Sequence, residues 1–250
     1  LTVAELGSPV AFARSSQVGY QFVRTRSYID LAPEVPLFEK LAASSVYREP
    51  VGVVGCITPW NYPLGQVIQK VVPALLMGNT VVLKPSQHTP LSCYCLARAF
   101  DRAGFPVGVF NMVTGRGSEI GDALATDPRV SMISFTGSTS GGVTVAKNAL
   151  ESVKRVSLEL GGKSPYVILP GLKDWDAPIR ILFNSIFLNS GQTCTAFSRL
   201  LVPESEAPAI EKRLVEIARE YVAGDPRDPA FMLGPLASAA QFRKVKAYIE

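Results

Sequence analysis

The fold is decided where the sequence becomes continuously apolar, at Val51-Gly52-Val53-Val54-Gly55-Cys56-Ile57. Such a run is typical of a strand that is buried on both faces of a sheet. It ends at Thr58-Pro59-Trp60-Asn61-Tyr62-Pro63, a turn that contains two prolines, and a helix is predicted from Leu64 to Met77. A buried strand, a turn and a helix in this order form the first half of a strand–helix–strand unit with parallel strands.

The same alternation continues along the chain. Further strands are predicted at 80–83, 109–113, 132–135, 166–169 and 200–202, and helices lie between them. Thr89 is predicted to cap one of these helices, with Pro90 at its first position. We therefore predict an α/β fold with a parallel-sheet domain over residues 1–160 and the first part of a second α/β domain over 161–250.

The two ends of the chain carry fewer signals. Residues 1–32 have a rough amphipathic pattern that predicts a helix, and 37–47 are predicted to form an extended hairpin or arm. An arm without its own core often packs on a neighbouring subunit, so we expect a homodimer or homotetramer. Neither end carries a helix start or stop signal, which suggests a piece of a longer protein.

Composition excludes several classes of protein. The chain has 250 residues, 47% of them hydrophobic and 18% charged, and a net charge of +4. This is the composition of a globular protein, and no basic stripe indicates nucleic-acid binding. The four cysteines fit neither a zinc site nor a disulfide framework, so we expect reduced thiols, no metal and a cytoplasmic location. No apolar run is long enough to predict a membrane span.

Two glycine-rich loops follow predicted strands. They are Gly115-x-Gly117-x-x-x-Gly121 and Gly137-Ser138-Thr139-Ser140-Gly141-Gly142. The first has one residue more than the dinucleotide-binding fingerprint, so its spacing alone does not identify that site. Backbone N–H groups at the start of a helix can nevertheless bind phosphate. Lys84 stands at the carboxyl end of a predicted strand, where α/β sheets bind ligands, with Ser86 and Gln87 beside it.

One cysteine lies among small and polar residues, in Gly191-Gln192-Thr193-Cys194-Thr195-Ala196. A thiolate is a strong nucleophile, and Glu159, in Glu159-Leu160-Gly161-Gly162-Lys163, could serve as its general base. Asn61, in the turn after the first strand, could donate its amide to a developing oxyanion. The alternatives are a structural cysteine, a solvated glutamate and an ordinary turn asparagine.

These motifs resemble the aldehyde dehydrogenase superfamily from about Pro50 to the end of the chain. Four blocks carry the resemblance: residues 59–64, 104–115, 159–165 and 191–194. The resemblance implies NAD(P)-dependent oxidation of an aldehyde to a carboxylic acid through a thiohemiacetal and a thioester on Cys194. It also implies that residues 1–160 bind the cofactor, that about 34–48 form an oligomerisation arm, and that 161–250 begin the catalytic domain.

The resemblance further assigns individual residues. It implies that Cys194, Glu159, Asn61 and Lys70 are catalytic, Lys70 as part of a proton relay. The implied cofactor-binding residues are Ile57, Thr58, Pro59, Trp60, Lys84, Ser86, Gln87, Gly117, Gly121, Phe135, Thr136, Gly137, Ser138, Leu160 and Gly161.

Two departures from the family pattern limit what is implied. Many NAD-preferring members have Glu at the position of Gln87, so the neutral Gln87 leaves NAD and NADP both open. The later Glu-x-Phe-Gly-Pro block is absent before Glu250, and we expect the 250 residues alone to turn over poorly. Alternatives are a coenzyme A-acylating member, a non-catalytic binding protein of the same fold, and a cysteine hydrolase that pairs Cys194 with His88.

Overall fold

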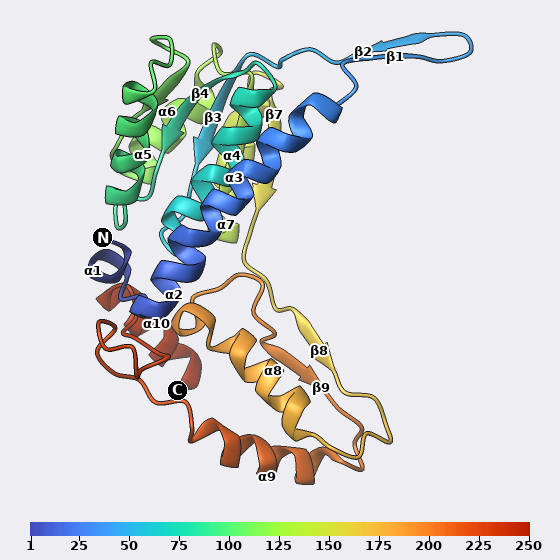
Figure 1. Cartoon of the computed structure of the whole chain (residues 1–250), viewed down its shortest axis with the longest axis vertical. Helices are drawn as coiled ribbons and strands as arrows, with labels where there is room; N and C mark the ends of the chain where they lie inside the picture. Colours follow the sequence, from blue (N-terminus) through green and yellow to red (C-terminus); the bar gives the residue numbers. More distant parts are fainter. The chain divides into compact units, whose positions relative to one another are not determined.

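The computed structural model describes residues 1–250, which form two compact units (Figure 1). The first unit comprises Leu1 and Arg14–Leu160, and the second comprises Thr2–Ala13 and Gly161–Glu250. Residues 2–13, expected in the first domain, therefore belong to the second unit. Their attachment includes a hydrogen bond from the Val10 backbone N–H to the Pro226 carbonyl oxygen, 2.7 Å long.

The first unit is built around a five-stranded parallel sheet, which confirms the predicted fold class. Its strands lie in the order β5-β4-β3-β6-β7. Their bounds are β3 Val53–Ile57, β4 Thr80–Lys84, β5 Phe110–Met112, β6 Met132–Thr136 and β7 Arg155–Glu159. Strand order reverses between β3 and β6, the place where ligands bind at the carboxyl edge of open α/β sheets.

Apolar clusters cover both faces of this sheet. Successive side chains of a strand point to opposite faces, so β3, for example, contributes to both clusters. On one face Val54 and Cys56 pack with Val67 and Val71 of α4 (Pro63–Leu76), which is followed along the chain by α5 (Leu91–Arg102). On the other face Ile133 is part of a cluster that includes side chains of the two helices next along the chain. These are α6 Asp122–Thr126 and α7 Thr139–Leu150, and η3 (Gly117–Gly121) precedes α6.

Two helix predictions were wrong in detail. Residues 1–32 do not form one helix but α1 (Thr2–Leu6), α2 (Val10–Phe12), the π-helix η1 (Ala13–Gly19) and α3 (Tyr20–Leu31). Gly7, at φ +75°, stops α1 in a backbone conformation that glycine adopts readily. Helix α5 begins at Leu91 rather than Pro90, and the Thr89 hydroxyl donates to the Trp60 carbonyl oxygen instead of capping the helix.

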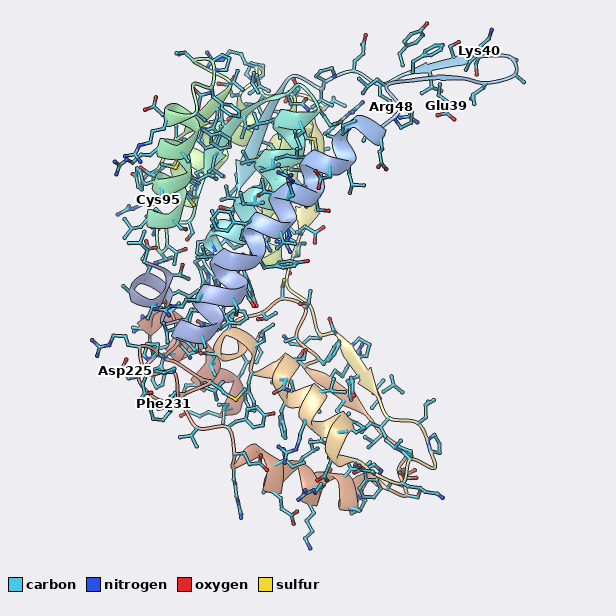
Figure 2. The ribbon with its side chains drawn as sticks, in the orientation of Figure 1. Glu39, Lys40, Arg48, Cys95, Asp225 and Phe231 are labelled. Atoms are coloured by element: carbon cyan, nitrogen blue, oxygen red, sulfur yellow. The ribbon has the colours of Figure 1, made fainter.

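The predicted arm is an antiparallel hairpin that follows η2 (Ala32–Glu34). Its strands are β1 (Phe38–Lys40) and β2 (Ser45–Tyr47). The rings of Phe38 and Tyr47 lie 4.9 Å apart, and Arg48 donates to Glu39 at 3.0 Å (Figure 2). The hairpin extends away from the sheet of the first unit (Figure 1). Its aromatic side chains Phe38 and Tyr47 are exposed.

The second unit contains a smaller α/β layer. Strands β8 (Pro165–Val167) and β9 (Arg199–Leu201) pair in parallel. Helices α8 (Asp176–Ile186) and α9 (Ala207–Ala218) share an apolar cluster with side chains of both strands. The chain ends with α10 (Ala239–Ile249). No helix in either unit has the length and apolar character that crossing a membrane requires.

Candidate active site

The carboxyl edge of the sheet carries unsatisfied polar groups at its switch point. Ile57 at the end of β3 pairs with Phe135 of β6, so Thr58 and Thr136 follow at adjacent positions. Both threonines are buried, and neither hydroxyl oxygen has a hydrogen-bond partner. Buried polar groups in proteins are almost always hydrogen-bonded, so this edge fits a polar ligand.

The loop after β6 brings backbone close to this edge. A Cβ on Gly137 would lie 2.6 Å from Cζ of Phe135, so only glycine fits there without a shift of the ring. Ser138 caps α7 by accepting a hydrogen bond from the Gly141 N–H at 3.1 Å. This is a strand end followed directly by a capped helix start, the arrangement that binds phosphate in dinucleotide sites.

The other glycine loop is built differently. Residues Gly117–Gly121 form the π-helical turn η3, and Gly121 is buried. A Cβ on Gly121 would lie 3.9 Å from Cδ1 of Ile57, which places this loop beside the end of β3. Around Gly117 there is open space, so no close approach requires glycine at that position.

Lys84 is the last residue of β4 and pairs with Ile57 of β3. It therefore lies at the carboxyl end of its strand, as predicted. Its side chain is buried, and Nζ donates to the Pro85 carbonyl oxygen at 2.9 Å. Burial lowers the pKa of Lys84. The Ser86 hydroxyl accepts from the His88 backbone N–H, and Gln87 is exposed and uncharged. A ligand at this edge would therefore meet one buried cation.

Lys70 lies on the α4-covered face of the sheet and is only 9% exposed. Its Nζ donates to the Ser134 hydroxyl at 3.0 Å. Burial lowers the pKa of Lys70, while the Cys56 thiol and then the Glu159 carboxylate act in the opposite direction. The charge of Glu159 therefore favours the ammonium form of Lys70.

The turn that carries Asn61 is anchored by side chains from elsewhere in the first unit. Gln17, which is 1% exposed on η1, donates from Nε2 to the Asn61 carbonyl oxygen at 3.0 Å. Thr89 holds the preceding Trp60 carbonyl at 3.0 Å. Sequence reasoning missed both anchors, because a polar residue in a helical pattern does not reveal which distant carbonyl it meets.

Cys194 lies in the second unit, in the turn between η4 (Leu188–Gly191) and β9. Just before it, Asn189, Ser190 and Gly191 have φ of 53°, 57° and 78°. Consecutive left-handed residues that are not glycine cost free energy and cluster at functional sites. A hydrogen bond from the Thr193 hydroxyl to the Leu188 carbonyl oxygen, 3.0 Å long, helps to hold this turn.

The surroundings of Cys194 differ from those of the other cysteines. All four are free, and Cys194 is half-buried. Cys56 and Cys93 are fully buried, and burial raises the pKa of the Cys56 thiol to about 12, which suppresses its thiolate. Cys95 is exposed on α5. Gly162 passes so close that a Cβ on it would lie 3.2 Å from the Cys194 carbonyl oxygen.

The remaining predicted residues lie as follows. Ile57 and Phe135 are buried, Pro59, Trp60 and Leu160 are half-buried, and Gly161 is exposed. Asn61, Lys70, Glu159 and the predicted cofactor residues up to Leu160 belong to the first unit, whereas Gly161 and Cys194 belong to the second. No group of three or more side chains is arranged to hold a metal ion.

Comparison with known proteins gives consistent matches. The profile of the aldehyde dehydrogenase family matches residues 1–250. The 3-succinoylsemialdehyde-pyridine dehydrogenase of a Pseudomonas species is 48% identical over 83% of this chain and 43% of its own length. The aminoacetaldehyde dehydrogenase of Pseudomonas aeruginosa is 45% identical over 84% of this chain and 42% of its own length.

A solved structure matches almost the whole chain. A mutant of aldehyde dehydrogenase C from Pseudomonas syringae, in complex with NAD+ and octanal, aligns with a TM-score of 0.96 and 41% identity. The match covers 99% of this chain and 51% of that structure. The chain thus spans about half the length of the proteins it matches.

Proposed function

The chain belongs to the aldehyde dehydrogenase family, and from this premise we propose that it takes part in the NAD(P)-dependent oxidation of an aldehyde to a carboxylic acid. The proposal assigns cofactor binding to the first unit and the nucleophile to the second. The half-buried, fixed Cys194 is the observation that carries it, since Cys56 and Cys93 are buried and Cys95 lies on a helix surface.

The cofactor residues are assigned to the carboxyl edge of the sheet. The unsatisfied hydroxyls of Thr58 and Thr136 offer hydrogen bonds, and the α7 start at Ser138 offers backbone N–H groups to phosphate. Lys84 supplies a cation for the adenosine ribose or its phosphate, and the uncharged Gln87 repels neither NAD nor NADP. A bound nicotinamide dinucleotide would accept the hydride that leaves the aldehyde carbon.

Cys194 would attack the aldehyde carbon as a thiolate and form a thiohemiacetal. The Asn61 amide and the Cys194 backbone N–H would donate hydrogen bonds to the oxyanion. One such donor is worth roughly 3 kcal/mol in the transition state, or about 10²-fold in rate. After loss of hydride, the carbon is left as a thioester on Cys194.

Glu159 would then activate the water that cleaves this thioester. The water oxygen forms a bond to the acyl carbon, the bond to sulfur breaks, and the carboxylic acid leaves. Glu159 ends β7 with an exposed side chain, and its backbone carbonyl accepts from the Gly137 N–H at 3.0 Å. Lys70 is the group to which Glu159 would pass the proton.

The test measures NAD(P)H formation by the purified full-length protein with short, branched, aromatic and amino aldehydes. Cys194→Ala should abolish turnover and keep dinucleotide binding, while the matched Cys95→Ala, at the surface of α5 in Figure 2, should change neither. Unchanged turnover in Cys194→Ala would refute the mechanism. Formation of an acyl-coenzyme A in place of the acid would favour the acylating alternative.

The substrate and the assembly are also proposed. The named relatives act on different aldehydes, so we assign a small-molecule aldehyde and no particular one. We propose that the exposed hairpin, with Leu37, Phe38 and Tyr47 more than half exposed, packs on another copy in a homodimer or homotetramer. The four free thiols are consistent with a cytoplasmic location.

A further inference from the structure

We propose that Ser134 is a positioning residue, which holds the Lys70 amine on the α4-covered sheet face so that it can exchange a proton with Glu159. The inference rests on the proposed function, because Glu159 acts there as the general base. Ser134 was not among the residues that the sequence motifs singled out.

The first argument is the register of the sheet. Ser134 pairs with Cys56 on β3 and with Ser157 on β7, and Thr136, two residues on, pairs with Glu159. Side chains that pair across parallel strands, and those two residues apart, lie on the same face. Ser134 therefore shares one face with the proposed base and lies in the strand between Cys56 and Glu159.

The second argument is the path of the Lys70 side chain. Lys70 lies on α4, which packs on β3 and β4, yet its Nζ reaches β6 and donates to the Ser134 hydroxyl at 3.0 Å. It forms no ion pair, and Ser134 is its hydrogen-bond acceptor. A buried amine needs such a partner, because burying a charge without one is costly.

The third argument is the charge around Lys70. The titratable groups that act on it are the Cys56 thiol on β3 and the Glu159 carboxylate on β7, and no other residue of α4 is charged. Burial disfavours the ammonium form and lowers the pKa of Lys70, while the hydrogen bond to Ser134 favours that form. The hydrogen bond to Ser134 thus opposes the effect of burial on the pKa of Lys70.

A hydroxyl suits this role because it accepts a hydrogen bond from the ammonium and can donate one to the neutral amine. When Glu159 has taken a proton from the attacking water, Lys70 in its neutral form can accept that proton. No bond other than O–H and N–H changes in this step. Without the hydroxyl the ammonium loses its acceptor, so the pKa of Lys70 should fall further.

The experiment compares Ser134→Thr with Ser134→Val in the full-length protein, because the two side chains have the same shape and only one has a hydroxyl. The direct readout is the pKa of Lys70 from NMR of 13C-methylated lysines, with the signal assigned by Lys70→Arg. We expect Thr to keep the wild-type value and Val to lower it by about one unit, the size of one hydrogen bond.

The matched control is Ser157→Ala, a serine on the same face that pairs with Ser134, whereas the hydrogen bond of Lys70 goes to Ser134. It should leave the pKa of Lys70 unchanged. In the pH profile of turnover, the rising limb should move to lower pH in Ser134→Val and stay in place in Ser134→Thr. Ser134→Ala is a second variant without the hydroxyl, should Val disturb the strand.

Two results would overturn the inference. One is a Lys70 pKa that is the same in the Thr and Val variants, and the other is an unmoved pH profile despite a changed pKa. The NMR titration does not depend on turnover. An inactive wild-type protein in which Ser134→Val still shifts the Lys70 pKa would therefore contradict the proposed function and leave the Ser134–Lys70 contact established.

Discussion

Replacing Thr136 by valine should have opposite effects on the stability of the free protein and on cofactor binding. The Thr136 hydroxyl is buried without a hydrogen-bond partner, and such a group costs about 1–3 kcal/mol. Valine removes it and keeps the shape of the side chain. The free energy of unfolding without cofactor should therefore rise by about 1 kcal/mol, or roughly 2–4 °C in Tm for a chain of this size.

Dinucleotide affinity should change in the other direction. A hydrogen bond from Thr136 to the bound dinucleotide, worth about 1.4 kcal/mol, corresponds to about tenfold in Kd. Thermal unfolding with and without NAD, together with calorimetric titration, measures both quantities. Thr58→Val should behave in the same way, because its hydroxyl is equally unsatisfied.

The control for this pair is Thr89→Val. Thr89 is also buried, but its hydroxyl donates to the Trp60 carbonyl oxygen at 3.0 Å. Its loss should lower the free energy of unfolding by about 1–3 kcal/mol. The reasoning would be refuted if Thr136→Val destabilised the free protein as Thr89→Val does, or if its Kd for NAD equalled that of the wild type.

Three further predictions follow from other contacts. Gln17→Leu removes the donor to the Asn61 carbonyl oxygen, so it should lower the free energy of unfolding by about 1–3 kcal/mol and reduce kcat. Chemical denaturation and steady-state kinetics measure the two effects, and an unchanged kcat would contradict the prediction. Burial raises the pKa of Cys56 from 9.0 to about 12 in the folded protein, so above pH 9 the folded state binds more protons than the unfolded state. The contribution of Cys56 to the free energy of unfolding is therefore complete below pH 9 and should be lost as the pH rises towards 12. Cys56→Ala should reduce that loss in denaturation curves across this range, and equal slopes would argue against it. Gly137→Ala should weaken dinucleotide binding, because its Cβ would displace the Phe135 ring; calorimetry that finds the wild-type Kd would count against this reading.

Four of the five strands of the parallel sheet were predictable from the sequence itself, whereas the edge strand β7 (Arg155–Glu159) was not predicted. The run before Thr58 is apolar on both faces, and a turn and a helix follow it, so its parallel pairing needed no long-range information. The placement of residues 2–13 was not predictable in this way. It depends on contacts with residues more than two hundred positions away, such as Pro226 and Pro235, which no local pattern encodes.

The candidate site likewise contains residues marked by local motifs and residues whose role depends on long-range contacts. Cys194, Glu159 and Asn61 stand in motifs whose residue types suggest chemistry, and their roles remain predictions. Gln17 and Ser134 carry no such motif, and each has a hydrogen bond to a residue far along the chain. For Thr89, a local pattern gave a wrong prediction. Its position just before a helix favours an N-cap, but its hydroxyl donates to the distant Trp60 carbonyl oxygen.

The left-handed turn at Asn189, Ser190 and Gly191 has a consequence for how this protein can evolve. Glycine at the first two positions would relieve backbone conformations that cost about 1–3 kcal/mol each. Selection for heat tolerance alone would favour that relief, yet it would loosen the segment that leads into Cys194. In this chain, two residues with side chains occupy those positions, so some resistance to unfolding is given up where the segment leads into Cys194.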